Sequence, residues 1–408
     1  MKFSKFLTLP KWVQLLPLLL FYLLLIIVWK LPTETAGDEG RYLNFTNNLL
    51  NGFYSPEMPN INLWNGPGFP IFLMPFVYLK FKLIQIRLIN GFLLYISLIF
   101  TYSTCNLYFD RKLSFFVTLI TGLYFPSFQM LRFIHTETLT WLIFSVVIYL
   151  SSKDLKKYSV YLGVLIGLLC LVKVIFVYVI LICIIIAVFS LFLKKTSKSM
   201  LPSTIKILVI AFVVFIPYLV YCQNLTHKFF YFTNSGGLSL YTMSSTDENE
   251  FGDWDVSVKF KELQNHQLVY NKIQTLNPIE KDSFLKQSAI TNIKNYPVKY
   301  LKNWSYNVSR MIVEYPYSYV PFSKKILVYM IPGLFAIICI MYSLGLYFRK
   351  FIHFDSSLFY LTLFFLVYLG ISSLLSAYGR MFFITIPFWT FFVARIKFGI
   401  KNLPKNHL

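Results

Sequence analysis

Long apolar runs separated by short polar segments occupy most of the chain. A membrane-spanning helix needs about 20 mainly apolar residues, with about 17 to 25 tolerated. A run at 158–193 is too long for one span, because at about 1.5 Å per residue it would reach ~54 Å against an apolar core of ~30 Å. It is predicted to fold as a hairpin with Lys173 near its tip. Further predicted spans cover residues 12–29, 88–108, 113–131, 138–150, 205–223, 326–348, 356–375 and 381–394. The pattern predicts an all-α polytopic membrane protein with about ten transmembrane helices.

The apolar segment 66–79 is short and holds three prolines, so it is either an eleventh span or a re-entrant, membrane-surface element. With ten spans, the basic loops share one side with both termini. The positive-inside rule then places both termini in the cytoplasm, whereas an eleventh span would export most of the basic loops. We therefore interpret 66–87 as a juxtamembrane element on the outer face.

Composition excludes a soluble multidomain protein. Hydrophobic residues make up 57% of the 408 residues and charged residues 13%, about half the roughly 25% of globular domains. The net charge of +21 falls mostly on the side of the termini. It is therefore attributed to orientation and contact with membrane lipids, and no nucleic-acid partner is expected.

Three regions are expected. Residues 1–223 form an N-terminal catalytic transmembrane module, with the juxtamembrane element at 31–87. Residues 224–325 form a small, mainly helical extracytoplasmic domain, and 326–408 form the C-terminal transmembrane helices and a basic cytoplasmic tail. Within the middle region, Asn277-Pro278 followed by Glu280 predicts a helix start, and a second helix is expected from Pro297 to about Val313. The acidic segment 246–255 is expected to be a solvated loop.

Candidate carboxylates lie next to two predicted spans. Asp38 and Glu39 follow the first span, and Glu137 precedes the span at 138–150. A carboxylate near apolar walls can act as a general base or a metal ligand. The alternatives are a solvated loop charge for the first pair, and for Glu137 a first-turn helix acid beside a Thr136 cap.

Isolated cations are expected on the same outer face. Arginine and lysine at a membrane-level cavity suit a phosphate or pyrophosphate; the alternative is snorkelling to lipid head groups. His135 could transfer protons or be a hydrogen-bonded structural residue. No residues show zinc spacing, a P-loop or a Rossmann glycine pattern, so no cofactor is expected and a divalent metal is compatible but not indicated. The cations are Arg41, Arg87, Arg132, Lys173 and Arg380.

The order of these motifs resembles the GT-C superfamily of integral membrane glycosyltransferases, in the branch that holds protein O-mannosyltransferases and lipid A aminoarabinose transferases. The similarity covers nearly the whole chain, although several relatives carry more spans or a larger outer domain. The segments that carry it are Gly37-Asp38-Glu39-Gly40-Arg41-Tyr42, Asn65-Gly66-Pro67-Gly68-Phe69-Pro70, Arg87, the stretch from Tyr124 to Glu137, the segment 168–173, the segment 234–240, the segment 279–301 and Tyr378-Gly379-Arg380.

The resemblance implies a polyprenyl-phosphate sugar donor and an acceptor that is a glycan, a lipid or a protein. Asp38 would be the catalytic base, Glu39 would position the acceptor or the motif, and Glu137 would be the second acid. Lys173, Arg380 and Arg87 would hold the phosphate. Substrate contacts are also expected from Arg41, Tyr42, Arg132, His135 and Tyr378.

The expected location is a bacterial plasma membrane, with an extracytoplasmic active site. The alternative function is a transporter or flippase of a lipid-linked saccharide, which should carry ionisable groups deep in its spans.

Overall fold

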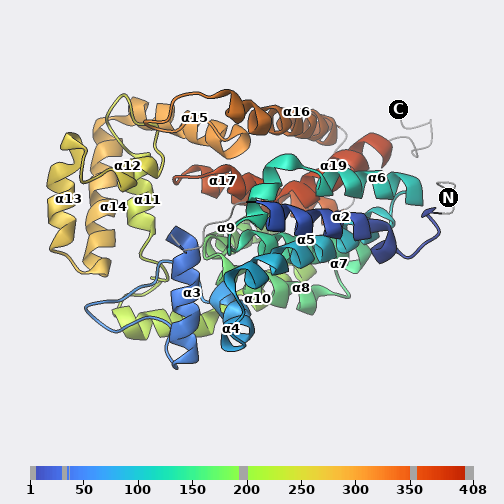
Figure 1. Ribbon diagram of the computed structural model, residues 1–408, viewed down its shortest axis with the longest axis horizontal. Helices are drawn as coiled ribbons and strands as arrows, with labels where there is room; N and C mark the ends of the chain where they lie inside the picture. Colours follow the sequence, from blue (N-terminus) through green and yellow to red (C-terminus); the bar gives the residue numbers. More distant parts are fainter. Residues whose placement is uncertain (1–5, 30–34, 36, 193–200, 350–355, 400–408) are drawn as a thin grey trace.

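The structure is a computed structural model that describes residues 6–29, 35, 37–192, 201–349 and 356–399 (Figure 1). Within these ranges the chain is built from α-helices and short 3-10 turns, without a β-strand, as the apolar pattern predicts. Residues 400–408, the end of the predicted basic tail, lie outside the described residues.

Several helices match the predicted spans. Four are long and apolar enough to cross a membrane: α2 (Lys11–Val28), α5 (Leu83–Cys105), α10 (Leu201–Thr226) and the stretch Lys324–Arg349, in which the 3-10 turn η3 (Lys324–Ile326) leads into α16 (Leu327–Arg349). The other apolar helices do not meet this criterion over their described residues, so the set of ten spans stays a prediction. They include α4 (Gly68–Tyr78), α8 (Ser159–Val172), α9 (Ile175–Phe192) and α17 (Ser356–Ser373).

Two of the predicted spans are interrupted. The run at 113–131 forms α6 (Arg111–Gly122) and the 3-10 helix η1 (Phe125–Leu131), which meet at 61°. Pro126 lies at this break, where its missing N–H and its ring oppose a continuous α-helix. The run at 381–394 divides into α18 (Gly379–Phe383) and α19 (Ile386–Gly399).

The expected break at Lys173 is confirmed, because α8 ends at Val172 and α9 begins at Ile175. Helix α4 has 11 residues and is therefore about 16 Å long, too short to cross an apolar core of ~30 Å. It packs against the end of α8: a Cβ atom on Gly68, its first residue, would lie 2.7 Å from the carbonyl carbon of Leu171. This agrees with an element that does not span the membrane.

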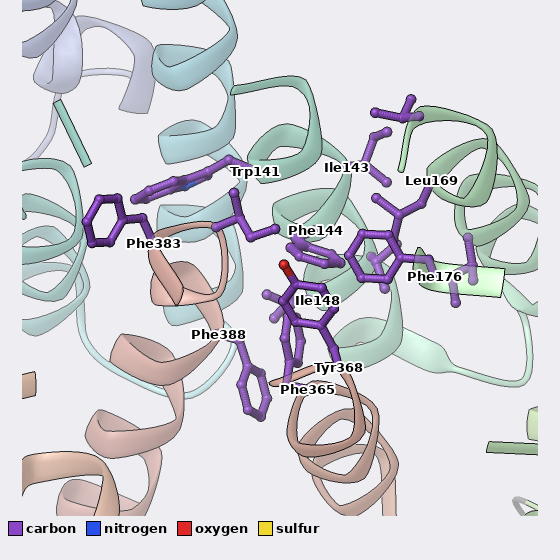
Figure 2. Close-up of a cluster of buried hydrophobic side chains, with 14 of the residues drawn as sticks. Trp141, Ile143, Phe144, Ile148, Leu169, Phe176, Phe365, Tyr368, Phe383 and Phe388 are labelled. Atoms are coloured by element: carbon purple, nitrogen blue, oxygen red, sulfur yellow. The ribbon is translucent and has the colours of Figure 1, made fainter. Parts of the chain in front are cut away.

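A cluster of buried aromatic and aliphatic side chains joins α8, α9, α17, α18 and α19 to α7 (Glu137–Asp154). The Phe176 ring stacks on Tyr368 at 4.7 Å, and the Phe365 ring stacks on Phe388 at 4.4 Å. Such packing fixes the relative positions of the helices that contribute to it. Figure 2 labels ten members: Trp141, Ile143, Phe144, Ile148, Leu169, Phe176, Phe365, Tyr368, Phe383 and Phe388.

Short helices gather at one end of the bundle (Figure 1). They are α11 (Gly236–Met243), α12 (Asp255–Val258), α13 (Gln267–Gln274) and α14 (Pro278–Asn295), with the 3-10 turn η2 (Gln264–His266), and α15 (Pro297–Val313) follows them. Their own apolar core contains Tyr241, Val256, Phe260, Ile273, Leu285 and Ala289.

The predicted start of α14 is confirmed. Oδ1 of Asn277 accepts hydrogen bonds from the backbone N–H groups of Ile279 and Glu280, both at 3.0 Å, and the Glu280 carboxylate accepts from the Asn277 N–H at 3.2 Å. This reciprocal cap satisfies backbone groups that a helix start leaves free. The second predicted helix is also present and ends at Val313.

The acidic segment 246–255 is only partly a solvated loop. Glu250 and Asp253 are fully buried. Glu250 accepts a hydrogen bond from Tyr319 at 2.7 Å and lies 2.9 Å from Nε2 of His266, while Asp253 accepts from the Ser318 hydroxyl at 2.6 Å. The solvated-loop prediction is wrong for these two acids because their partners come from later segments, which local charge does not reveal.

Arg310, on α15, connects the region of helices α11 to α15 to the rest of the bundle. Its side chain is fully buried and lies 3.7 Å from Asp253. Arg310 donates hydrogen bonds to the backbone oxygens of Phe251, Gly252, Pro316 and Ala377 and to the side chain of Asn307. Because Ala377 comes directly before the Tyr378-Gly379-Arg380 segment, Arg310 anchors the segment that carries Arg380.

Replacing Arg310 with Met is expected to lower the free energy of unfolding by about 3 kcal/mol or more, because buried acceptors and Asp253 lose their partner. Thermal unfolding of the detergent-purified protein measures this loss. The control is Lys302→Met on the same helix, whose side chain is 54% exposed and whose surface ion pair contributes about 1 kcal/mol at most. Equal melting temperatures for the two variants would contradict the role given to Arg310.

Candidate functional site

A cavity of about 1130 Å³ lies where the bundle meets the helices of residues 236–313, and the main predicted residues meet in it. They come from four separate stretches of the chain, including α3 (Gly37–Leu50). Seven of the predicted residues line the cavity: Asp38, Arg41, Tyr42, Glu137, Lys173, Tyr378 and Arg380.

Arg380 bridges the two carboxylates at the centre of the cavity wall. Its Nη1 atom donates to Oδ2 of Asp38 at 2.8 Å, and its Nε atom lies 3.9 Å from Oε1 of Glu137. Nζ of Lys173 donates to the same Glu137 oxygen at 2.9 Å. Arg41 pairs with the other oxygen of Asp38. Acids and cations therefore alternate along one wall.

Each of these side chains lies at the end of an element. Asp38 is in the first turn of α3, and Glu137 is the first residue of α7, where a negative charge interacts favourably with the helix dipole. Thr136 is the N-cap residue of α7, as the alternative interpretation expects, but its side chain makes no capping hydrogen bond. Lys173 occupies the break between α8 and α9, and Arg380 lies in the short helix α18.

Asp38 is held in its charged form. Burial alone would raise the pKa of its carboxyl group, but the guanidinium groups of Arg380 and Arg41 outweigh burial and hold that pKa well below its usual range. Asp38 is therefore a carboxylate at neutral pH. Its basicity depends on how closely these two cations stay beside it.

Glu39 and Arg87 form a buried pair behind the cavity wall. Nε and Nη2 of Arg87 donate to the two oxygens of Glu39 at 3.0 and 2.9 Å, and the Ile134 N–H donates to Glu39 at 3.0 Å. The two side chains are 3% and 2% exposed. Glu39 thus orients the segment that carries Asp38. Arg87 does not line the cavity, which corrects the expectation that it contacts a phosphate there.

Arg132 and His135 also lie outside the cavity lining. The Arg132 guanidinium stacks on the Trp29 ring at 5.5 Å. The His135 ring stacks on Phe133 at 5.3 Å, with its Nδ1 atom 4.0 Å from Glu137. Burial lowers the pKa of His135 and favours the neutral ring. Neither side chain reaches the cavity lining, so the expected substrate contacts of Arg132 and His135 find no support in the cavity.

The two predicted tyrosines line the cavity beside the charged residues. Tyr42 accepts a hydrogen bond from Nδ2 of Asn65 at 3.1 Å through its hydroxyl oxygen. The Tyr378 ring lies between the Arg380 guanidinium at 5.7 Å and the Tyr317 ring at 5.9 Å. Tyr378 therefore limits how the Arg380 side chain can move.

The structure adds a third carboxylate that sequence reasoning missed. Glu314 lines the cavity, has a left-handed backbone (φ 57°) and accepts a hydrogen bond from the Tyr317 hydroxyl at 2.5 Å. Burial raises the pKa of Glu314. Its carboxylate packs against Gly379, where a Cβ atom would lie 2.2 Å from Oε1, so this contact requires glycine in the Tyr-Gly-Arg segment. Nothing in the local sequence marks Glu314.

Within the residues that the structure describes, no group of three or more His, Cys, Asp or Glu side chains is placed to hold a metal ion. Comparison of the chain with protein-family models, curated proteins and solved structures finds no match. The geometry of the cavity therefore carries the functional argument.

The Glu39–Arg87 pair makes a testable structural prediction. Glu39→Met should lower the free energy of unfolding by about 3 to 5 kcal/mol, since it leaves a buried guanidinium without its carboxylate. The double variant Glu39→Met with Arg87→Met should lose less than the single variant, because both charges are gone. Chemical or thermal unfolding in detergent measures the double-mutant cycle. Additive losses would show that the pair is not coupled.

Proposed function

We propose that the protein is an integral membrane glycosyltransferase that moves a sugar from a polyprenyl-phosphate donor to an acceptor hydroxyl. The observation that carries this proposal is the convergence of Asp38, Glu137, Lys173 and Arg380 on one cavity. A transferase of this kind needs cations for a leaving phosphate and a base for the acceptor, and the cavity wall supplies both.

The cations are suited to the leaving group. Breaking a sugar–phosphate bond increases the negative charge on phosphate, and preplaced cations stabilise that charge. Lys173 and Arg380 are bound to carboxylates in the free protein. A donor phosphate would compete with Glu137 and Asp38 for these cations.

The same competition activates Asp38. Beside Arg380 and Arg41, this carboxylate is a weak base. When the phosphate draws Arg380 away, the electrostatic stabilisation of the Asp38 carboxylate falls and its basicity rises. Donor binding thereby prepares the group that accepts the acceptor's proton.

The reaction then proceeds in one displacement. The acceptor oxygen forms a bond to the anomeric carbon as the bond from that carbon to the phosphate oxygen breaks. The electron pair of the broken bond goes to the phosphate, and the acceptor proton goes to Asp38. Attack from the face opposite the phosphate gives inversion at the anomeric carbon.

We further propose that ten spans place both termini in the cytoplasm and the cavity on the outer face of a bacterial plasma membrane, with residues 224–325 as an extracytoplasmic domain. The bias of basic loops supports this orientation. The cavity lining includes Ser239 of α11, Lys286 of α14 and Trp254 just before α12, which supports a site on the same side as residues 224–325. The donor lipid would enter from the outer leaflet.

The alternative is a transporter or flippase of a lipid-linked saccharide. In the four helices long enough to span, every Lys, Arg, Asp or Glu lies within six residues of an end. A coupled transporter usually carries such groups deeper in its spans. The distribution favours an enzyme that opens to one side.

Asp38→Asn is expected to reduce sugar transfer by about 10²- to 10⁴-fold, because the acceptor loses its general base. The assay follows sugar release from a radiolabelled polyprenyl-phosphate donor by purified protein in detergent, where a transporter should not turn over. The control is Glu57→Gln, an exposed acid in the same outer segment. Transfer by Asp38→Asn at the wild-type rate would remove Asp38 from the mechanism.

Lys173→Ala and Arg380→Ala should weaken binding of the donor more than binding of the acceptor. Loss of a charge-assisted contact of about 1.5 to 3 kcal/mol corresponds to a rise of about 10- to 100-fold in the KM for the donor. Initial rates at varied donor and fixed acceptor measure this change, with the exposed Lys272→Ala as the control. An unchanged dependence on the donor would indicate that the two cations serve only the structure.

A further inference from the structure

Two tryptophans form an aromatic wall in the cavity that the proposed reaction does not use. Trp64 follows α3, and Trp254 comes from the outer region, immediately before α12. Both line the cavity, and their ring centroids are 6.0 Å apart with the planes tilted by 54°. Segments distant in the sequence thus place two aromatic rings in a cavity that also holds the charged residues and many aliphatic side chains.

The aromatic wall adjoins Asp38. The Arg41 guanidinium lies 5.2 Å from the centre of the Trp64 ring and also pairs with Oδ1 of Asp38. The other oxygen of this carboxylate faces Arg380 at 2.8 Å. Asp38 therefore lies between a cationic side, suited to the donor phosphate, and an aromatic side.

Two polar atoms on the aromatic side lack a hydrogen-bond partner among the described residues. They are Nε of Arg41, a donor, and Oδ1 of Asn65, an acceptor, and both atoms are buried. Nδ2 of Asn65 already donates to the Tyr42 hydroxyl, and this bond fixes which end of the amide is Oδ1, the acceptor. Buried polar atoms are rarely left unpaired in folded proteins, so Arg41 and Asn65 have unused hydrogen-bonding capacity beside the aromatic wall.

A saccharide matches these features. Its C–H faces pack against the electron-rich faces of aromatic rings, while its hydroxyl groups donate and accept hydrogen bonds around the edge. A mainly apolar wall with a few oriented polar groups is typical of small-molecule sites. Thr233, Ser235 and Ser257 add hydroxyl groups to the same cavity.

We propose that Trp64 and Trp254 form an acceptor subsite for a saccharide, so that the attacking hydroxyl belongs to a glycan or glycolipid. Trp254 supplies the ring that contacts the sugar, and Arg41 holds Trp64 beside Asp38. The transfer step rests on the proposed function, whereas saccharide binding by the aromatic wall does not require turnover.

The first test measures binding without catalysis. Saturation-transfer NMR on the full-length protein in detergent uses maltotriose, cellotriose and chitotriose as probes, with a serine- and threonine-containing peptide for comparison. Saccharide signal is expected for the wild type and for Trp254→Phe, which keeps an aromatic face. Trp254→Leu, which keeps only apolar bulk, should reduce it at least tenfold. Trp12→Ala, which alters an exposed tryptophan in α2 outside the cavity lining, should leave it unchanged.

The second test measures transfer in membranes that contain the natural acceptor. A radiolabelled donor gives two products, the glycosylated acceptor and free sugar released when water replaces the acceptor. Trp254→Leu should lower the ratio of transfer to hydrolysis at least tenfold and leave the KM for the donor unchanged. In the transfer assay, a wild-type ratio in Trp254→Leu would overturn the subsite. In the binding test, the subsite would be overturned by the absence of any saccharide signal, by a signal unaffected by Trp254→Leu, or by binding of the peptide alone.

The two tests separate this inference from the function on which it rests. Trp254-dependent saccharide binding in a protein that never releases sugar from the donor would preserve the subsite and reject the transferase. Donor turnover with a wild-type ratio in Trp254→Leu would preserve the transferase and reject the subsite.

Discussion

The bridge that Arg380 makes between Asp38 and Glu137 is the interaction on which the cavity depends. Two largely buried carboxylates on one wall of the cavity would repel each other and lose much of their hydration. Arg380 and Lys173 supply the compensating charge. The same arrangement leaves the cations available for another anion, because a phosphate can replace a carboxylate as their partner.

Two buried structures hold this bridge in place. The first is the aromatic cluster of Figure 2, which contains Trp141, Phe176 and Phe383. These residues follow Glu137, Lys173 and Arg380, respectively, by three or four positions in the chain. The packing that joins the helices therefore also sets the spacing of the charges. The second is Arg310, which binds the carbonyl group of Ala377, just before the segment that carries Arg380. Charge placement thus follows from apolar packing and one buried cation.

Features that depend on neighbouring residues in the sequence were predicted well. Apolar runs indicated the helical membrane character, the charge at Lys173 indicated a break in a long apolar run, and Asn277 with Glu280 indicated a helix start. Length alone overestimated the continuity of some runs, as Pro126 illustrates. Residue type and position also selected most of the charged residues that line the cavity.

What the sequence did not reveal depends on distant partners. Arg87 is an isolated cation in the sequence, yet it is paired with Glu39 behind the wall. Glu250 and Asp253 look like solvated charges in the sequence, but residues from later segments cover them. Glu314 reaches the cavity only because the chain turns after α15. Burial of an ionisable group is decided by tertiary contacts, and no local signal encodes these.

The most direct test of the account is an experimental structure of the purified protein with a polyprenyl-phosphate sugar bound. The account predicts that the phosphate lies within hydrogen-bond distance of Nζ of Lys173 and the guanidinium group of Arg380, with Arg380 displaced from Asp38 and the sugar between the phosphate and that carboxylate. A phosphate bound elsewhere, with the Arg380 bridge intact, would contradict it.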